Sequence, residues 1–113
     1  MNSKEFRSAT GCFVTGVTIV TATDNSRFIG VTANSFSSVS LEPPLVLWSL
    51  SKNSQKHPIM TSVKNYAINI LSKSQEEVAI RFSQYKEPFS GLDFYYSGLG
   101  VPLIKNAVAI LEC

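Results

Sequence analysis

GVTANSFSSVSLEPPLVL, residues 30–47, is the stretch around which the rest of the chain is organised. It begins like a β-strand, passes through a run of uncharged polar residues, and ends in two prolines before a second apolar run. Uncharged donors suit a ligand with many hydrogen-bond acceptors, or a phosphate held by neutral groups, so the run predicts a binding surface. Its hydroxyl and amide side chains are Thr32, Asn34, Ser35, Ser37, Ser38 and Ser40.

The composition indicates one soluble globular domain over residues 1–113. The chain is 44% hydrophobic and 16% charged, which is enough apolar content for a single core. A net charge of +2, with lysine and arginine scattered along the chain, disfavours a nucleic-acid surface. No apolar run approaches the roughly 20 residues of a membrane helix. Because the N-terminus also lacks the apolar segment of a signal peptide, we expect a cytoplasmic protein.

Familiar catalytic and metal-binding patterns are missing from the sequence. The two cysteines, Cys12 and Cys113, lie at opposite ends and indicate neither a metal site nor a disulfide framework. His57 precedes a proline at a predicted helix start, where a capping or surface role is favoured over catalysis. Neither a G-x-S-x-G elbow nor a glycine-rich phosphate loop is present. Classical catalytic sets are therefore thin in this sequence, and a zinc site has little support.

Short β-branched and apolar runs predict five strands. The first two are joined by the turn residues Asp24–Ser26 and form a predicted antiparallel hairpin. Pro43 and Pro44 are expected at a turn or at the first residue of a strand, because proline cannot donate a ladder hydrogen bond. The predicted strands are Val17–Ala22, Phe28–Asn34, Leu45–Leu50, Tyr66–Leu71 and Ala107–Cys113.

Three short helices and one long loop complete the prediction. Helices are expected over Ser3–Cys12, over Pro58–Val63, and from Ser74 to about Ser83, the last opened by a capping box with Glu77. Residues 84–100 form a predicted loop rich in aromatic residues. In the fourth strand Asn69 falls on the face opposite its isoleucine neighbours, so it is a candidate for a polar contact, either inward or at a sheet edge. Short strands with few helices predict an α+β, mainly β fold with an antiparallel sheet or barrel.

A second polar group follows the third predicted strand, at Ser49, Ser51, Lys52, Asn53 and Ser54. Serine and threonine are also common on exposed faces of antiparallel sheets, so composition alone leaves both interpretations open. Two neighbouring strands that each end in small donors, with a lysine nearby, could form a groove for a phosphate and the edge of a flat polar ring.

The residues carry a family resemblance over nearly the whole chain. T-x-N-S-F-x-S-V-S-x-x-P-P at residues 32–44 is its most specific part. FVTGVTIVT at 13–21, YAINIL at 66–71, and LEC at 111–113 follow in the same order as in the family. On these motifs the chain resembles the flavin reductase-like family, whose members have the antiparallel, Greek-key-like FMN-binding split barrel.

The resemblance implies a homodimeric NAD(P)H:flavin oxidoreductase that binds FMN or FAD and supplies reduced flavin to a partner monooxygenase. NADH or NADPH would donate a hydride to flavin N5, so no catalytic side chain is needed. The implied ring contacts are Thr32, Ala33, Asn34 and Ser35, continued by Ser37 and Ser40. The implied contacts to the ribityl chain and phosphate are Ser49, Leu50, Ser51 and Ser54, with Lys52 as a counter-charge and Arg81 and Phe82 beside the flavin.

The chain departs from the family pattern at its end. Family members continue past the Leu-Glu-Cys strand with a Gly-Asp-His turn and the strands that complete the barrel, so we expect a C-terminally truncated domain with an uncovered apolar edge. The alternatives are a flavin- or haem-binding split-barrel module without reductase activity, and a structural dimerisation remnant. The choices of FMN against FAD, and of NADH against NADPH, stay open.

Overall fold

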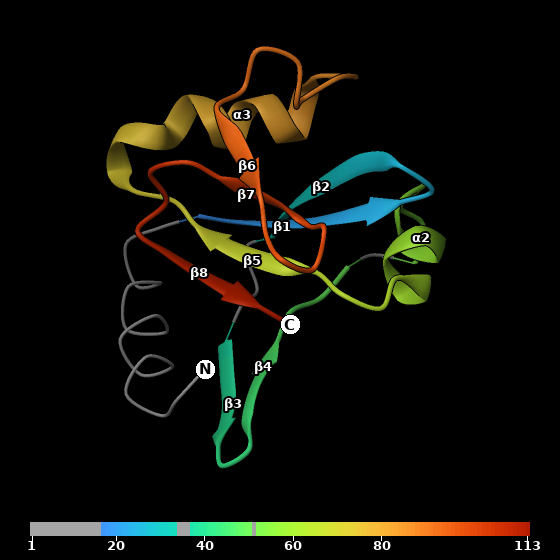
Figure 1. The fold of residues 1–113 in the computed structure, drawn as a ribbon, viewed down its shortest axis with the longest axis vertical. Coiled ribbons are helices and arrows are strands. Elements are labelled where there is room, and N and C mark those ends of the chain that lie inside the picture. Colours follow the sequence, from blue (N-terminus) through green and yellow to red (C-terminus); the bar gives the residue numbers. More distant parts are fainter. Residues whose placement is uncertain (1–16, 34–36, 51) are drawn as a thin grey trace.

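A four-stranded antiparallel sheet is the centre of the fold in the computed structural model, which describes residues 17–33, 37–50 and 52–113. Its strands lie in the order β2–β1–β5–β8 (Figure 1). The mainly β, antiparallel fold that we predicted is confirmed, whereas the predicted helix over Ser3–Cys12 lies outside the described residues. The strands of this sheet are Thr18–Asp24 (β1), Arg27–Ala33 (β2), Ala67–Ile70 (β5) and Ala109–Glu112 (β8).

The β1–β2 hairpin closes through a two-residue turn. Asp24 pairs with Arg27, and the turn residues Asn25 and Ser26 have φ angles of 49° and 68°. Positive φ at both turn positions matches the right-handed twist of the flanking strands, and small polar residues tolerate it best. The predicted hairpin is therefore confirmed.

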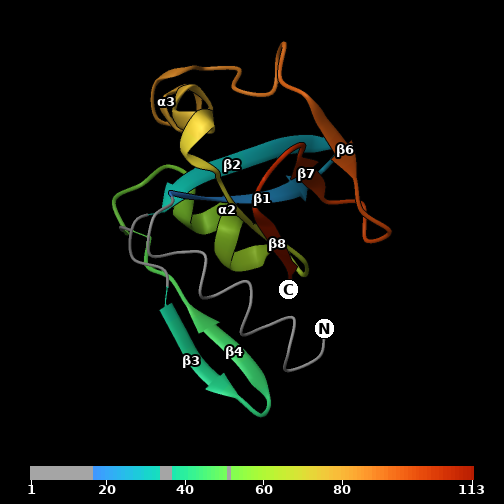
Figure 2. The ribbon, with the colours of Figure 1, turned by 90° about the vertical axis from the view of Figure 1, so that its left-hand side faces the viewer.

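Both faces of the sheet are covered, because successive side chains of each strand point to opposite sides. Val20 and Ile68 pack on one face with Met60 of helix α2, which spans His57–Ser62. Ile19 packs on the other face with Phe82 of helix α3, which spans Glu76–Gln84. In Figure 2, α3 and α2 lie on opposite sides of β1 and β2. No helix in the described part of the chain is long and apolar enough to cross a membrane.

A buried polar bridge joins the sheet to a second hairpin, formed by β6 (Phe94–Tyr96) and β7 (Pro102–Ile104). Asn69 Nδ2 donates to Thr21 Oγ1 at 3.0 Å, and Asn69 Oδ1 accepts from the Ile104 N–H at 2.9 Å. Thr21 Oγ1 in turn donates to the Pro102 carbonyl at 2.6 Å. Of the two contacts predicted for Asn69, inward or at an edge, the structure has the inward one. Satisfied buried groups of this kind fix one arrangement of the two layers.

A third hairpin projects away from the sheet (Figures 1 and 2). It pairs β3 (Ser37–Leu41) with β4 (Pro44–Leu47), and Pro44 is the first residue of its strand, as predicted. The predicted strand over Leu45–Leu50 is too long at its C-terminal end. Trp48 and Leu50 leave the ladder because their side chains pack against the core cluster instead.

Helix starts differ from the predictions by one or two residues. α2 has Lys56 rather than His57 at its N-cap, with Pro58 in its first turn. The predicted capping box of Ser74 and Glu77 is wrong: the box joins Ser72 and Gln75, whose Oε1 accepts from the Ser72 N–H at 3.0 Å. A 3-10 turn over Lys73–Gln75 therefore precedes α3.

The predicted loop over 84–100 is also wrong in part, because it contains β6. β6 and β7 have three residues each, too few to show a two-residue period in the sequence. The final predicted strand, Ala107–Cys113, is present as the shorter β8 and lies at one end of the sheet order.

Gly30 lets α3 pack closely on β2. A Cβ atom built on Gly30 would overlap the ring of Phe82, whose side chain is only 4% exposed. The strand can therefore approach the aromatic ring only where no side chain intervenes.

We predict that Gly30→Ala lowers the free energy of unfolding by about 1–3 kcal/mol, the usual cost of overpacking a core. Urea denaturation followed by circular dichroism measures the change. Gly98→Ala is the matched control, because nothing lies within 4 Å of the added Cβ atom. Equal stability of the two variants would contradict the close packing.

Candidate functional site

Two of the polar segments that the sequence singled out meet at the apolar core. Ala33 ends β2, is 3% exposed, and belongs to the same apolar cluster that Trp48 and Leu50 pack against. Leu50 lies in the irregular segment just after β4. The end of β2 and the chain beyond β4 thus border the same apolar cluster.

Hydrogen bonds fix the end of β2 in place. Thr32 Oγ1 donates to the Ala79 carbonyl of α3 at 3.4 Å, and the Ala33 carbonyl accepts from Thr18 Oγ1 at 2.6 Å. Both bonds hold the strand to its neighbours. Asn34 and Ser35, which follow directly in the sequence, lie outside the described residues, as does Ser51.

A pocket of about 340 Å³ lies between the exit of β4 and helix α2. Two predicted site residues, Ser49 and Leu50, line it together with His57. Its volume lies at the small end of the range of roughly 300–1,000 Å³ for small-molecule pockets, and its walls combine apolar side chains with a few polar groups. The remaining lining residues are Trp48, Met60 and Thr61.

The other predicted polar residues near this pocket have local roles. Ser54 Oγ accepts from the Lys56 N–H at 3.2 Å, and the Ser54 carbonyl accepts from the His57 N–H at 3.1 Å, so Ser54 helps to start α2. Lys52 is exposed two residues before it. In the projecting hairpin, Ser37 pairs with Leu47, whereas Ser40 Oγ accepts from the Glu42 N–H at 3.3 Å near the tip.

Arg81 and Phe82 lie on α3, on the other side of the sheet from the pocket at α2. Arg81 Nη1 donates to the Ser90 carbonyl at 2.7 Å, and its guanidinium lies 5.3 Å from the centre of the Tyr85 ring. The Phe82 ring makes an edge contact with Phe89 at 5.0 Å between centroids. Phe82 is a core residue here, and the structure does not bring this pair to Ser49 and Leu50.

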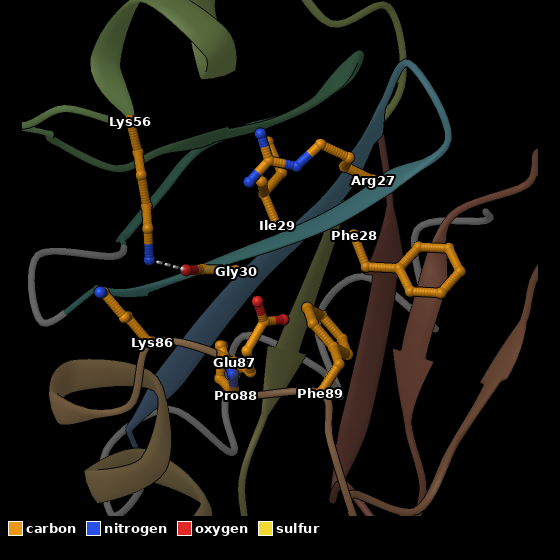
Figure 3. A pocket seen from close by; sticks show the side chains of 9 residues that line it. All are labelled: Arg27, Phe28, Ile29, Gly30, Lys56, Lys86, Glu87, Pro88 and Phe89. Atoms are coloured by element: carbon orange, nitrogen blue, oxygen red, sulfur yellow. Dashed lines mark hydrogen bonds between the residues drawn. The ribbon is translucent and has the colours of Figure 1, made fainter.

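A second cleft, of about 250 Å³, was not foreseen from the sequence (Figure 3). It lies between β2, the start of α2 and the chain after α3, and three of its lining residues are the cations Arg27, Lys56 and Lys86. Lys56 Nζ donates to the Gly30 carbonyl at 2.7 Å, and burial lowers the pKa of Lys56. Because these cations are about thirty positions apart in the sequence, no local motif could reveal them.

The chemistry of these groups suits a phosphorylated, many-acceptor ligand. Hydroxyl groups of Ser49 and Thr61 belong to residues that line the pocket at α2, and the ammonium of Lys56 lies in the second cleft, near the start of the same helix. Within the described residues, no group of three histidine, cysteine or acidic side chains is placed to hold a metal ion. Neutral donors next to cations are the groups expected around a flavin nucleotide.

Comparisons with known proteins agree with this chemistry. Residues 10–113 match the family described as the flavin reductase like domain. The chain is 47% identical over 112 residues to the FMN reductase (NADH) SmoA of Agrobacterium fabrum, covering 99% of this chain and 64% of that protein. It is 36% identical over 115 residues to the reductase subunit HsaB of a flavin-dependent monooxygenase of Mycobacterium tuberculosis, covering 100% of this chain and 61% of that subunit.

Solved structures show the same fold. The NADH:FAD oxidoreductase SgcE6 of Streptomyces globisporus, in complex with NAD and FAD fragments, aligns with a TM-score of 0.81 at 42% identity. That alignment covers 88% of this chain and 61% of that one. The chain thus spans less than two thirds of the length of each of these three relatives. With a family match over residues 10–113 and the same fold, the chain belongs to the flavin reductase-like family.

Proposed function

We propose that the protein is an NAD(P)H:flavin oxidoreductase that binds FMN or FAD. The observation that carries this proposal is the 47% identity, across 99% of the chain, to a protein named as an NADH-dependent FMN reductase. Relatives named as reductase subunits of flavin-dependent monooxygenases support a role in supplying reduced flavin to such a partner. We place this activity in the cytoplasm and assign it to one domain over residues 1–113.

The proposed flavin site follows the two polar segments on either side of the projecting hairpin. We assign the ring to residues 32–35, continued by Ser37 and Ser40, and the ribityl chain and phosphate to residues 49–51 and Ser54. Lys52 supplies a counter-charge. The assignment is supported by the apolar cluster that contains Ala33 and that Leu50 packs against, because both segments border it. The resemblance also implies Arg81 and Phe82 beside the flavin; from its place on α3, Phe82 would serve the site by holding α3 against β2.

The protein's own part in the reaction is to bind and orient. When bound, the flavin accepts a hydride at N5 from the reduced nicotinamide. Amide and hydroxyl donors of residues 32–40 would face the edge of the ring where negative charge gathers, and fixed donors stabilise such charge without reorganising. Ala33 belongs to an apolar cluster and Leu50 packs against it, and these two residues would exclude water from their side of the proposed flavin site. None of these tasks requires a side-chain acid or base.

An anaerobic titration tests the proposal. FMN and FAD are added in turn while flavin fluorescence is followed, and NADH or NADPH is then added while absorbance near 450 nm is recorded. Quenching followed by bleaching supports the reductase. Binding without bleaching would indicate a flavin carrier instead, and no binding would contradict the proposed site altogether.

We predict that the double substitution Asn34→Leu and Ser35→Leu weakens flavin binding at least tenfold, because it removes ring-edge donors and adds bulk to the site. Fluorescence titration measures the affinity, and circular dichroism shows whether the fold is kept. The exposed serines Ser74 and Ser83 on the α3 side, both changed to leucine, are the matched control. Unchanged affinity in the Asn34 and Ser35 variant would refute the site assignment.

We further propose that the protein is a homodimer and that the projecting β3–β4 hairpin contacts a second copy. The hairpin exposes large apolar side chains on both strands, including Val39 (59% exposed), Leu45 and Leu47 (55% exposed). It stands clear of the sheet in both views (Figures 1 and 2). Exposed apolar surface of this kind is typical of interfaces, and the family resemblance makes a second copy its occupant.

We predict that Leu45→Lys together with Leu47→Glu raises the dimer dissociation constant at least tenfold, because charges would be buried in an apolar contact. Sedimentation velocity over a range of concentrations measures this constant. Leu99→Glu, at an exposed leucine outside the hairpin, is the control and should leave the dimer intact. A wild-type protein that stays monomeric at high concentration would argue against the dimer.

A further inference from the structure

Lys56 is a half-buried amine that lines the second cleft. It directly precedes α2, and its Nζ reaches β2, where it donates to the Gly30 carbonyl at 2.7 Å. Figure 3 shows the side chain extended from the start of α2 to that carbonyl. Burial lowers the pKa of Lys56, because desolvation penalises the ammonium form. A larger fraction of this amine is therefore unprotonated at neutral pH than of an exposed lysine.

The hydrogen bond to Gly30 leaves the unprotonated amine able to react. A neutral lysine amine has two N–H groups and one lone pair, and one N–H is enough for the bond to the carbonyl. The bond holds the nitrogen at one place in the cleft while its lone pair stays available to an electrophile. Lysine amines become nucleophiles in proteins when they are desolvated or lie beside other cations. Burial meets the first of these conditions.

Two further cations border the same cleft and meet the second condition. Lys86 follows α3, and Arg27 begins β2. In Figure 3 the Lys86 ammonium lies near the Lys56 nitrogen, and the Arg27 guanidinium points toward the same side. Glu87 is the one acidic side chain among the described residues that line the cleft. Positive charge is therefore in excess even when Lys56 is unprotonated, so the cleft attracts anions.

The aromatic side of the cleft is already packed. Phe28 and Phe89 contact each other at 5.7 Å between ring centroids, and both contact Phe94. Phe89 also makes an edge contact with Phe82. Because these rings cover one another, the side of the cleft that is open to a small molecule is the charged one. A small anion that contains an electrophilic carbon matches the amine and the two cations.

We propose that Lys56 is a site of acylation by acyl phosphates, small anions such as acetyl phosphate in which a carbonyl carbon is bound to a phosphate. Arg27 and Lys86 would hold the phosphate through charge-assisted hydrogen bonds, which brings the acyl carbon to the Lys56 amine. The same cations would stabilise the charge that gathers on the phosphate as it leaves.

The reaction balances without any further reactant. The lone pair of Lys56 Nζ forms a bond to the acyl carbon, and the bond from that carbon to the phosphate oxygen breaks. The phosphate leaves with the bonding electron pair and takes up the proton that the nitrogen loses. Nothing is oxidised or reduced, so the step is independent of the proposed function, in which a hydride passes to flavin.

Acylation would change the charge of the cleft and keep its hydrogen bond. The modified side chain is an uncharged amide, so one of the three cations is lost. Its remaining N–H can still donate to the Gly30 carbonyl, which would leave the link between β2 and the start of α2 in place.

Incubation of the full chain with acetyl phosphate is the first test, with mass spectrometry of proteolytic peptides giving the rate at each lysine. At neutral pH Lys56 should react about threefold faster, or more, than Lys64 and Lys105, which are exposed and lie outside the cleft. Its rate should saturate with acetyl phosphate, because the anion binds first, and inorganic phosphate should slow this lysine alone. A linear rate equal to that of the exposed lysines would overturn the proposal.

A second test compares two acetylating reagents on variants of the cleft. Lys86→Gln and Arg27→Gln each remove one cation and should slow the reaction of Lys56 with acetyl phosphate about threefold or more. Neither should slow its reaction with acetic anhydride, which has no phosphate to be held. Lys105→Gln is the matched control and should change neither rate.

Two outcomes of this comparison would refute the proposal. Equal slowing with both reagents would show that the substitutions disturb the surroundings of Lys56 rather than the binding of phosphate. Unchanged rates with acetyl phosphate would show that Arg27 and Lys86 do not recruit it. Modification of Lys56 in a protein that neither binds nor reduces flavin would refute the proposed function and leave the acylation site standing.

Discussion

The contact between Gly30 and Phe82 is the constraint on which the rest of the structure depends. Because Gly30 has no side chain, the Phe82 ring lies directly on β2, and α3 follows that ring onto one face of the sheet. The same glycine offers its carbonyl to Lys56, which holds the start of α2 near the strand. One position thus relates α3 and the start of α2 to β2, and Gly30 itself lines the cleft beside Lys56.

Much of the sheet could be predicted from the sequence because its strands have a strong pattern. β1 and β5 are runs of β-branched and apolar residues, and the polar Asn69 in such a run indicated an inward contact that the structure contains. The predictions failed where a strand was too short to show a two-residue period, and where several residues could have begun a helix. β6 and β7 have three residues each, and several polar residues near position 74 could have begun the capping box.

The candidate site was predictable only where its residues are close in sequence. The polar segments around Thr32 and Ser49 are continuous runs, and the structure places both beside one apolar cluster. The lysines and arginines, among them Arg27, Lys56 and Lys86, are scattered along the chain, a pattern that disfavours a nucleic-acid surface. Folding gathers these three in one cleft (Figure 3). Spacing in sequence is thus a poor guide to charge density on a surface built from three elements.

The projecting hairpin has a mechanical consequence. In the sequence the hairpin lies between residues 32–35 and residues 49–51, the two segments proposed to bind the flavin. A second copy in contact with the hairpin would therefore hold in place the two chain segments that are proposed to bind the flavin. Since coupling free energies are reciprocal, flavin would tighten the dimer by the same factor by which the dimer tightens flavin. The protein would then lose its cofactor on dilution, and regain it as copies meet.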